Sequence, residues 1–127
     1  MIEFGQFKIY LVDDDPSIRK GLRRLLQSFG FTVEVFGSAE EFLEAKVDES
    51  NSCLILDINL GNMSGFGLQE HLSDTGSNLP VIFITAYDDE HTHRKILKTG
   101  APFLIKPFAD QNLLQVLHSV ADRMEPA

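Results

Sequence analysis

The sequence has little of what disulfide-linked, secreted or membrane-spanning proteins need. Cys53 is the single cysteine, so the chain cannot form an internal disulfide framework. No apolar run approaches the roughly 20 residues of a membrane-spanning helix. The first residues, MIEFGQFK, lack the basic head and apolar core of a signal peptide. We therefore expect a cytoplasmic protein without a membrane segment.

Basic residues are also scarce. Eleven Lys and Arg residues stand against 19 Asp and Glu residues, which gives a formal net charge of −8. Nucleic-acid phosphates repel such a chain, so we expect no direct binding of nucleic acid. The apolar fraction of 43% is ordinary for a globular protein, and 127 residues are enough for one domain with a proper core.

Short apolar segments alternate five times with amphipathic ones. We predict strands at Lys8–Val12, Thr32–Phe36, Ser52–Leu56, Val81–Ile84 and Phe103–Ile105. The expected helix caps are Asp15, Ser38, Asp88 or Asp89, and Asp110. This alternation predicts an α/β fold of the flavodoxin-like (βα)5 type, a three-layer sandwich whose central parallel sheet has the order 2-1-3-4-5. The domain is expected to cover residues 1–122, and residues 123–127 to begin a linker or tail.

The first predicted helix begins at Asp15, which is followed by proline at the first helical position. Asp15 therefore has a structural role as a cap. Asp13 and Asp14 have no such role. The polar face of this helix is basic, and we expect it to be solvated: Arg19, Lys20, Arg23 and Arg24.

Residues with reactive side chains stand at the ends of four of the five predicted strands: Asp13 and Asp14, Asp57, Thr85, and Lys106. In open parallel sheets, ligands bind outside the carboxyl ends of the strands. In the order 2-1-3-4-5 Asp57 lies at the centre, with the neighbouring strands about 4.8 Å away on either side. We therefore expect one site at this edge.

Carboxylates at one edge need a cation, because two of them about 5 Å apart repel by roughly 3 kcal/mol at an effective dielectric constant near 20. Oxygen ligands with room for water and phosphate suit Mg²⁺. A hydroxyl, an ammonium and a metal around a central carboxylate would bind an anion next to a nucleophile. The pattern indicates phosphoryl transfer onto Asp57, with the metal and Lys106 neutralising charge on the phosphoryl oxygens.

The motifs LVDDDPSIR, LILDINLGNMSG, VIFITAY and FLIKPF together resemble the response-regulator receiver (CheY-like) domain of bacterial two-component systems. MSGFGLQEHL and LPVIFITAYDD are most similar to the FixJ/NarL-type transcriptional regulators of that family. The resemblance implies a signalling phosphoacceptor that catalyses only its own phosphorylation and dephosphorylation, rather than an enzyme acting on other substrates.

The resemblance also implies roles for individual residues. Asp57 is the expected phosphoacceptor. The expected ligands of Mg²⁺, for which Mn²⁺ can substitute, are Asp13, Asp14, Asp57 and the backbone carbonyl of Asn59. The expected phosphoryl-binding groups are the Thr85 hydroxyl, the Ala86 backbone N–H and the Lys106 ammonium. The Lys106–Pro107 bond is expected to be cis.

In the family, phosphorylation draws the residue equivalent to Thr85 inward, and the aromatic three residues before the lysine, here Phe103, follows it. The surface of the fourth helix, fifth strand and fifth helix then changes. The implied partners are a sensor histidine kinase and a C-terminal output domain, usually helix-turn-helix, which lies outside this chain. A phosphorylation-dependent homodimer is also implied.

The sequence departs from the family in two places. Gly61 stands where proline is usual, which predicts a more mobile loop, and the segment from Gly100 to Lys106 is one residue shorter than usual. The shorter segment bears on the pose of Phe103. We also hypothesise that Asn59 and Tyr87 tune hydrolysis of the phosphoryl group by crowding or orienting the attacking water.

Two other functions fit parts of the pattern. A haloacid-dehalogenase-type phosphatase also uses an aspartate nucleophile, and Asp13-x-Asp15 fits its first motif. However, Pro16 and Ser17 do not suit what should follow, and no acidic pair ends a strand after Lys106. A receiver-like interaction module that is never phosphorylated is the other alternative, which the shortened segment leaves open.

Overall fold

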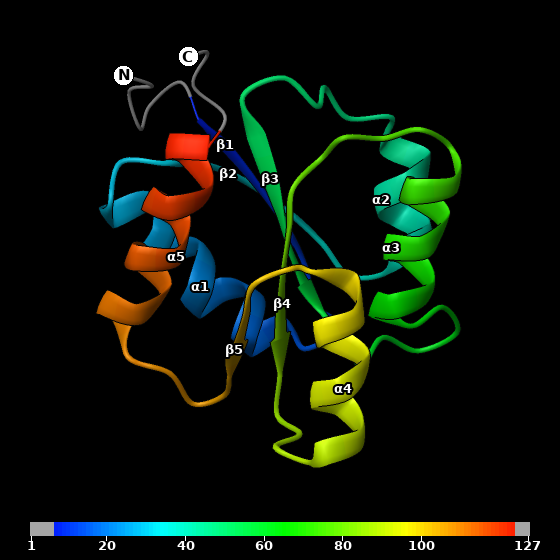
Figure 1. Ribbon diagram of the computed structural model, residues 1–127. Coiled ribbons are helices and arrows are strands. Elements are labelled where there is room, and N and C mark those ends of the chain that lie inside the picture. The colour runs from blue at the N-terminus through cyan, green and yellow to red at the C-terminus, as the bar shows by residue number, and fades with distance from the viewer. Residues whose placement is uncertain (1–6, 124–127) are drawn as a thin grey trace.

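A five-stranded parallel sheet lies between two layers of helices in the computed structural model, which describes residues 7–123 (Figure 1). The strand order is β2-β1-β3-β4-β5, as predicted. The strands are β1 (Lys8–Val12), β2 (Thr32–Phe36), β3 (Ser52–Asp57), β4 (Val81–Thr85) and β5 (Phe103–Ile105). The helices are α1 (Pro16–Ser28), α2 (Ala39–Ala45), α3 (Gly65–Asp74), α4 (Glu90–Thr99) and α5 (Asp110–Arg123).

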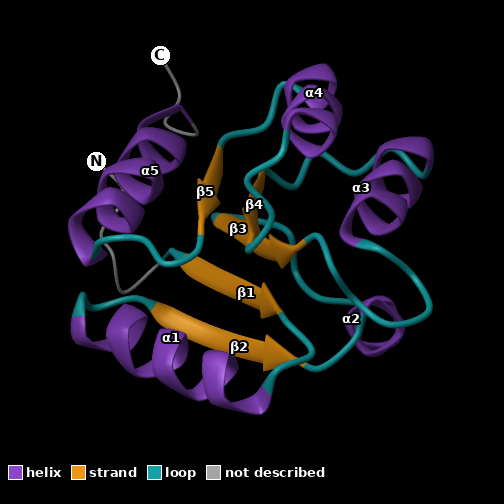
Figure 2. Ribbon diagram, turned by 90° about the horizontal axis from the view of Figure 1, so that it is seen from below, coloured by secondary structure: helices purple, strands orange, loops and turns teal. Residues whose placement is uncertain are grey.

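Helices α1 and α5 cover one face of the sheet, and α2, α3 and α4 cover the other (Figure 2). Side chains of β3 alternate between the two layers. Ile55 packs in the core with α1 and α5, whereas Leu54 and Leu56 pack in the core with α2, α3 and α4. All of β3 is buried. The unbroken apolar run in the sequence thus reflects a central strand that is covered on both faces.

Side-chain caps start most of the helices where the sequence predicts them. The Asp15 carboxylate accepts the Ser17 N–H at 2.8 Å, and the Ser38 hydroxyl accepts the Glu41 N–H at 3.1 Å. Asp89 rather than Asp88 caps α4. The prediction for Asp110 is wrong, because α5 begins at Asp110 itself. The carboxylate therefore lies in the first turn, where it favours the positive end of the helix dipole.

Other local expectations have mixed outcomes. The Lys106–Pro107 bond is cis, as expected. Apart from Arg123, which ends α5, the predicted tail of residues 123–127 lies outside the described residues. Within residues 7–123, no helix combines the length and apolar character needed to cross a membrane.

The basic face of α1 is only partly solvated. Lys20, Arg23 and Arg24 are exposed, as predicted. The prediction is wrong for Arg19, which is partly buried and donates from Nη1 to the backbone carbonyl of Asp13 at 2.7 Å. Long side chains on a helix lean toward its N-terminus, and Arg19 therefore reaches the loop between β1 and α1.

The start of α3 lies directly against the end of β3. A Cβ atom on Gly65 would lie 2.5 Å from the carbonyl oxygen of Asp57 and 2.8 Å from Cα of Ile58. The Gly65 N–H also donates to the Ile58 carbonyl at 2.8 Å. Only glycine allows α3 to approach this closely, and the contact fixes the backbone that carries Asp57.

We expect Gly65→Ala to lower the free energy of unfolding by about 2 kcal/mol or more, because the new methyl group would displace backbone atoms rather than a flexible side chain. Gly21→Ala is the matched control. Gly21 is an exposed residue of α1 with nothing within 4 Å of the added Cβ. Its replacement should stabilise the protein by about 0.5–1 kcal/mol. Urea denaturation of both variants checks this, and equal midpoints would contradict the close approach.

Candidate functional site

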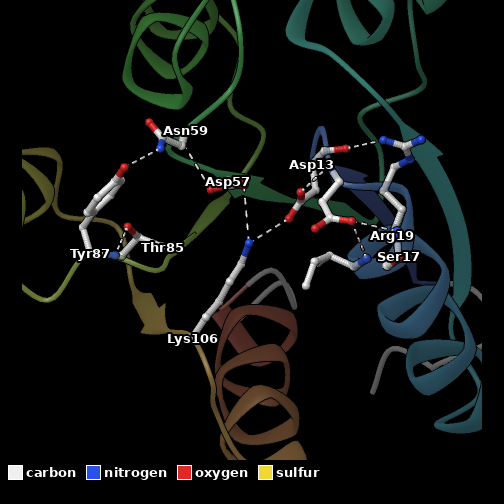
Figure 3. A network of polar contacts seen from close by, with 10 residues as sticks. Asp13, Ser17, Arg19, Asp57, Asn59, Thr85, Tyr87 and Lys106 are labelled. Carbon is white, nitrogen blue, oxygen red and sulfur yellow. Dashed lines mark hydrogen bonds and ion pairs between the residues drawn. The ribbon is translucent and has the colours of Figure 1, made fainter.

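Most of the predicted site residues meet at the carboxyl edge of the sheet, and Figure 3 shows the polar contacts among them. Asp13 follows β1, Asp57 ends β3, and Thr85 ends β4. Lys106 follows β5 and reaches back across the edge. Its Nζ lies 3.0 Å from Oδ2 of Asp13 and 3.4 Å from Oδ2 of Asp57. The sheet order thus brings together residues that are up to 93 positions apart in the sequence.

Three carboxylates form a cluster in this site. Asp13, Asp14 and Asp57 each offer an oxygen, and these oxygens lie within 4.8 Å of one another. Asp13 and Asp57 are buried, whereas Asp14 is exposed and leaves one side of the cluster open. A set of hard oxygen donors that is open to water fits Mg²⁺, which keeps part of its hydration shell.

Both carboxylate oxygens of Asp13 have a bonding partner. The Asp13 side chain is fully buried. Oδ1 accepts the Asp15 N–H at 2.9 Å, and Oδ2 pairs with Lys106. A buried carboxylate requires such partners, because burying an unpaired charge carries a large free-energy cost. Asp13 is therefore a rigid member of the cluster.

The Asp57 carboxylate has a raised pKa. Its Oδ1 accepts the Asn59 N–H at 3.1 Å, and its Oδ2 faces Lys106. Burial raises its pKa to about 6, and the charge of Asp13 adds to the rise, while the Asn59 N–H and Lys106 oppose it. Above that pH Asp57 is an anion in a poorly hydrated position, which is the state that a nucleophile requires.

Lys106 is the positive counterpart of the cluster. Burial by itself lowers the pKa of its ammonium, but the hydrogen bond to Asp13 and the charges of Asp57 and Asp13 outweigh burial and raise the pKa. Lys106 therefore stays protonated at neutral pH. Its backbone N–H donates to the Thr85 carbonyl at 2.7 Å, which anchors the base of the side chain beside β4.

A polar bridge connects the loops that follow β3 and β4. Nδ2 of Asn59 donates to the Tyr87 hydroxyl at 3.0 Å, and the Tyr87 N–H donates to Oγ1 of buried Thr85 at 3.0 Å (Figure 3). Ala86, between Thr85 and Tyr87, is exposed. Asn59 thus lies beside Asp57, and Tyr87 is connected to Asp57 through Asn59. Their influence on hydrolysis stays a prediction.

Phe103 lies away from this cluster. It is partly buried, and its ring centre is 5.3 Å from that of His93 on α4. Nε2 of His93 lies 3.0 Å from Oδ1 of Asp88, close enough for an ion pair but without hydrogen-bond geometry. The Phe103 side chain therefore extends from β5 and packs against α4 in this structure. The sequence offered no signal for the contact with His93.

Comparison with known proteins assigns the family. Residues 9–118 match the response regulator receiver domain, so the chain belongs to this family. The transcriptional regulatory protein TdiR of Thauera aromatica is 39% identical over 112 residues, which are 87% of this chain and 49% of TdiR. The chain spans about half the length of the curated relatives that it matches first.

Solved structures of the family share the fold. The response regulator StyR has a TM-score of 0.82 and 44% sequence identity, covering 91% of this chain and 59% of StyR. The crystal structure of FixJ-N has a TM-score of 0.85 and 32% identity, covering 95% of this chain and 98% of that one. The predicted likeness to FixJ-type regulators and the predicted CheY-like fold are both confirmed.

The raised pKa of Asp57 predicts how stability depends on pH. The folded state holds this proton more tightly than the unfolded state does, so the free energy of unfolding falls as the pH rises from about 4 to about 6. Without divalent metal, Asp57→Asn should therefore melt several degrees above the wild type at pH 7.5, and the difference should vanish below about pH 4.

Thermal unfolding in EDTA at these two pH values checks this prediction. Asp122→Asn, an exposed carboxylate on α5, is the matched control and should leave the melting temperature nearly unchanged. If the melting temperature of Asp57→Asn is still higher than that of the wild type at low pH, the substitution stabilises the protein for a reason other than the buried charge.

Proposed function

We propose that this receiver domain accepts a phosphoryl group from a sensor histidine kinase onto Asp57, in a Mg²⁺-dependent reaction in the cytoplasm. The observation that carries the proposal is the environment of Asp57. Its carboxylate is buried, ionised above about pH 6, and flanked by two further carboxylates and by the Lys106 ammonium. This arrangement can hold a cation and a phosphoryl group beside a nucleophile.

In the proposed reaction, an Asp57 oxygen attacks phosphorus and the bond to the donor's leaving group breaks. Asp13, Asp14, Asp57 and the Asn59 carbonyl would hold Mg²⁺, or Mn²⁺ in its place, which neutralises charge on the phosphoryl oxygens. Lys106, now between Asp13 and Asp57, would turn to a phosphoryl oxygen. The Thr85 hydroxyl and the Ala86 N–H would bind the remaining oxygens. The domain thus acts on itself and not on other substrates.

An apolar cavity next to the site supports the kinase as the phosphoryl donor. It has a volume of about 760 Å³ and lies between α1 and the loop from β5 to α5. Apolar side chains of both elements line it, among them Leu22 and Phe108, and Lys106 and Ala86 belong to both the cavity and the site. A helix of the kinase that docks here would bring its phosphohistidine to Asp57.

We propose the surface of α4, β5 and α5 as the output of the switch. Thr85 would move toward the phosphoryl group and Phe103 would turn inward, away from His93. Leu97 on α4 is 70% exposed, and β5 is the edge strand of the sheet, so this surface can receive a second copy or an output domain. Residues 1–122 would form the receiver and 123–127 would lead into that output domain, expected to be a DNA-binding helix-turn-helix.

Incubation with acetyl phosphate followed by intact-mass measurement tests the phosphoacceptor. We expect a single phosphoryl adduct on the wild type that requires Mg²⁺ and is absent from Asp57→Asn. Asp74→Asn, an exposed residue at the end of α3, is the matched control and should be phosphorylated like the wild type. No adduct on folded wild type with Mg²⁺ present would favour the unphosphorylated interaction module instead.

The bridge between Asn59 and Tyr87 predicts the lifetime of the adduct. Tyr87→Ala should shorten the phosphoryl half-life several-fold, because it removes the hydroxyl that binds the Asn59 side chain and the ring that, in our proposal, limits the approach of water to the phosphoryl group. Tyr87→Phe keeps the ring and removes only the hydroxyl, so its phosphoryl half-life should lie between those of the wild type and Tyr87→Ala. Loss of phosphoryl group after removal of the donor measures these rates. Equal half-lives would remove Tyr87 from the mechanism.

A further inference from the structure

Arg19 connects α1 to the loop that carries the carboxylates. Its Nη1 donates to the Asp13 carbonyl oxygen at 2.7 Å (Figure 3). This carbonyl belongs to a fully buried residue just past the end of β1, where a buried carbonyl requires a donor. The Asp13 N–H on the other side donates to the Phe36 carbonyl at 3.2 Å. Arg19 thus holds the peptide that joins Asp13 to Asp14.

The loop from β2 to α2 makes room for the guanidinium. A Cβ atom on Gly37 would lie 3.3 Å from Nη1 of Arg19, which is tighter than ordinary contact. Gly37 itself is fixed, because its N–H donates to Oε2 of Glu41 at 2.8 Å. Arg19 is therefore packed between α1 and this loop, rather than extended into solvent as Arg23 is.

Asp14 is the member of the cluster that depends on this peptide. Asp13 is held by Asp15 and Lys106, and Asp57 by Asn59 and Lys106. Among residues 7–123, no hydrogen bond or ion pair holds the Asp14 carboxylate. Its position within 4.8 Å of the other two carboxylates is therefore set by its backbone. The Asp13–Asp14 peptide is the part of that backbone that Arg19 holds.

We infer that Arg19 is a positioning residue for the metal site, which keeps the Asp14 carboxylate at ligand distance by holding the Asp13–Asp14 peptide. The inference rests on the proposed function, in which Asp14 is a metal ligand. The positive charge of Arg19 has the opposite effect on Mg²⁺ affinity, because it repels the cation. Loss of Arg19 therefore weakens Mg²⁺ binding if position dominates and strengthens it if charge dominates.

Titration with Mg²⁺, followed by two-dimensional amide NMR, measures the dissociation constant and also shows whether each variant is folded. Arg19→Met removes the donors and keeps an apolar stem, and it should weaken Mg²⁺ binding about tenfold. Arg19→Lys keeps a donor and the charge and should recover most of the affinity. Arg23→Met removes one exposed charge from the same helix and should change the affinity less than about twofold.

Gly37→Ala provides an independent test with Arg19 intact, because its methyl group would press on Nη1 of Arg19 and require the guanidinium to shift by a few tenths of an ångström. Like Arg19→Met, it should weaken Mg²⁺ binding. In the Arg19→Met background it should cause no further loss of Mg²⁺ affinity. If Arg19→Met does not fold, Gly37→Ala decides the question. Additive losses from Gly37→Ala and Arg19→Met would overturn the inference, because the two changes would then act separately.

Phosphorylation by acetyl phosphate separates this inference from the proposed function. Arg19→Met should need about tenfold more Mg²⁺ for half-maximal rate, with the rate at saturating Mg²⁺ within about twofold of the wild type. If Arg19→Met binds Mg²⁺ as tightly as the wild type or more tightly, and the wild type is phosphorylated normally, the role of Arg19 is overturned and the proposed function is not affected. A wild type that binds Mg²⁺ and takes no phosphoryl group would refute the proposed function and leave the role of Arg19 in metal binding to stand.

Discussion

The repulsion among three carboxylates at one end of the sheet is the constraint on which the rest of the site depends. One ammonium, that of Lys106, lies between Asp13 and Asp57 and offsets part of it. Burial then leaves Asp57 with a raised pKa. The metal-free site is therefore an unfavourable arrangement that the rest of the fold must stabilise. A cation relieves the imbalance, whereas a phosphoryl group adds negative charge, so such a site would bind the phosphoryl group only together with the cation.

The fold meets this constraint with rigid backbone at each carboxylate. β3 is buried on both faces and delivers Asp57 to the edge, where Gly65 brings α3 against the same backbone. Asp13 is fixed through both of its oxygens. Asp14 is exposed and owes its place to the peptide that Arg19 holds. The three carboxylates are thus positioned in three different ways, and the least constrained carboxylate is the one that faces water.

Short contacts lead from the site toward α4. Asn59 lies next to Asp57 and binds Tyr87, which in turn donates to Thr85. The loop after Tyr87 approaches His93, and His93 covers Phe103. The Phe103 ring thus lies against α4. A shift of Thr85 in response to phosphorylation would therefore act on a surface that is already in contact with the site loops.

The sequence by itself determined the strands, most of the caps and the gathering of Asp57 with its neighbours. These features follow from local periodicity and from the rule that parallel strands end at a common edge. Only the tertiary structure decided that Arg19 turns back to a buried carbonyl, that Asn59 binds Tyr87, and how far Lys106 reaches. Such contacts join side chains from separate segments, and their geometry depends on packing and rotamers that no local pattern encodes.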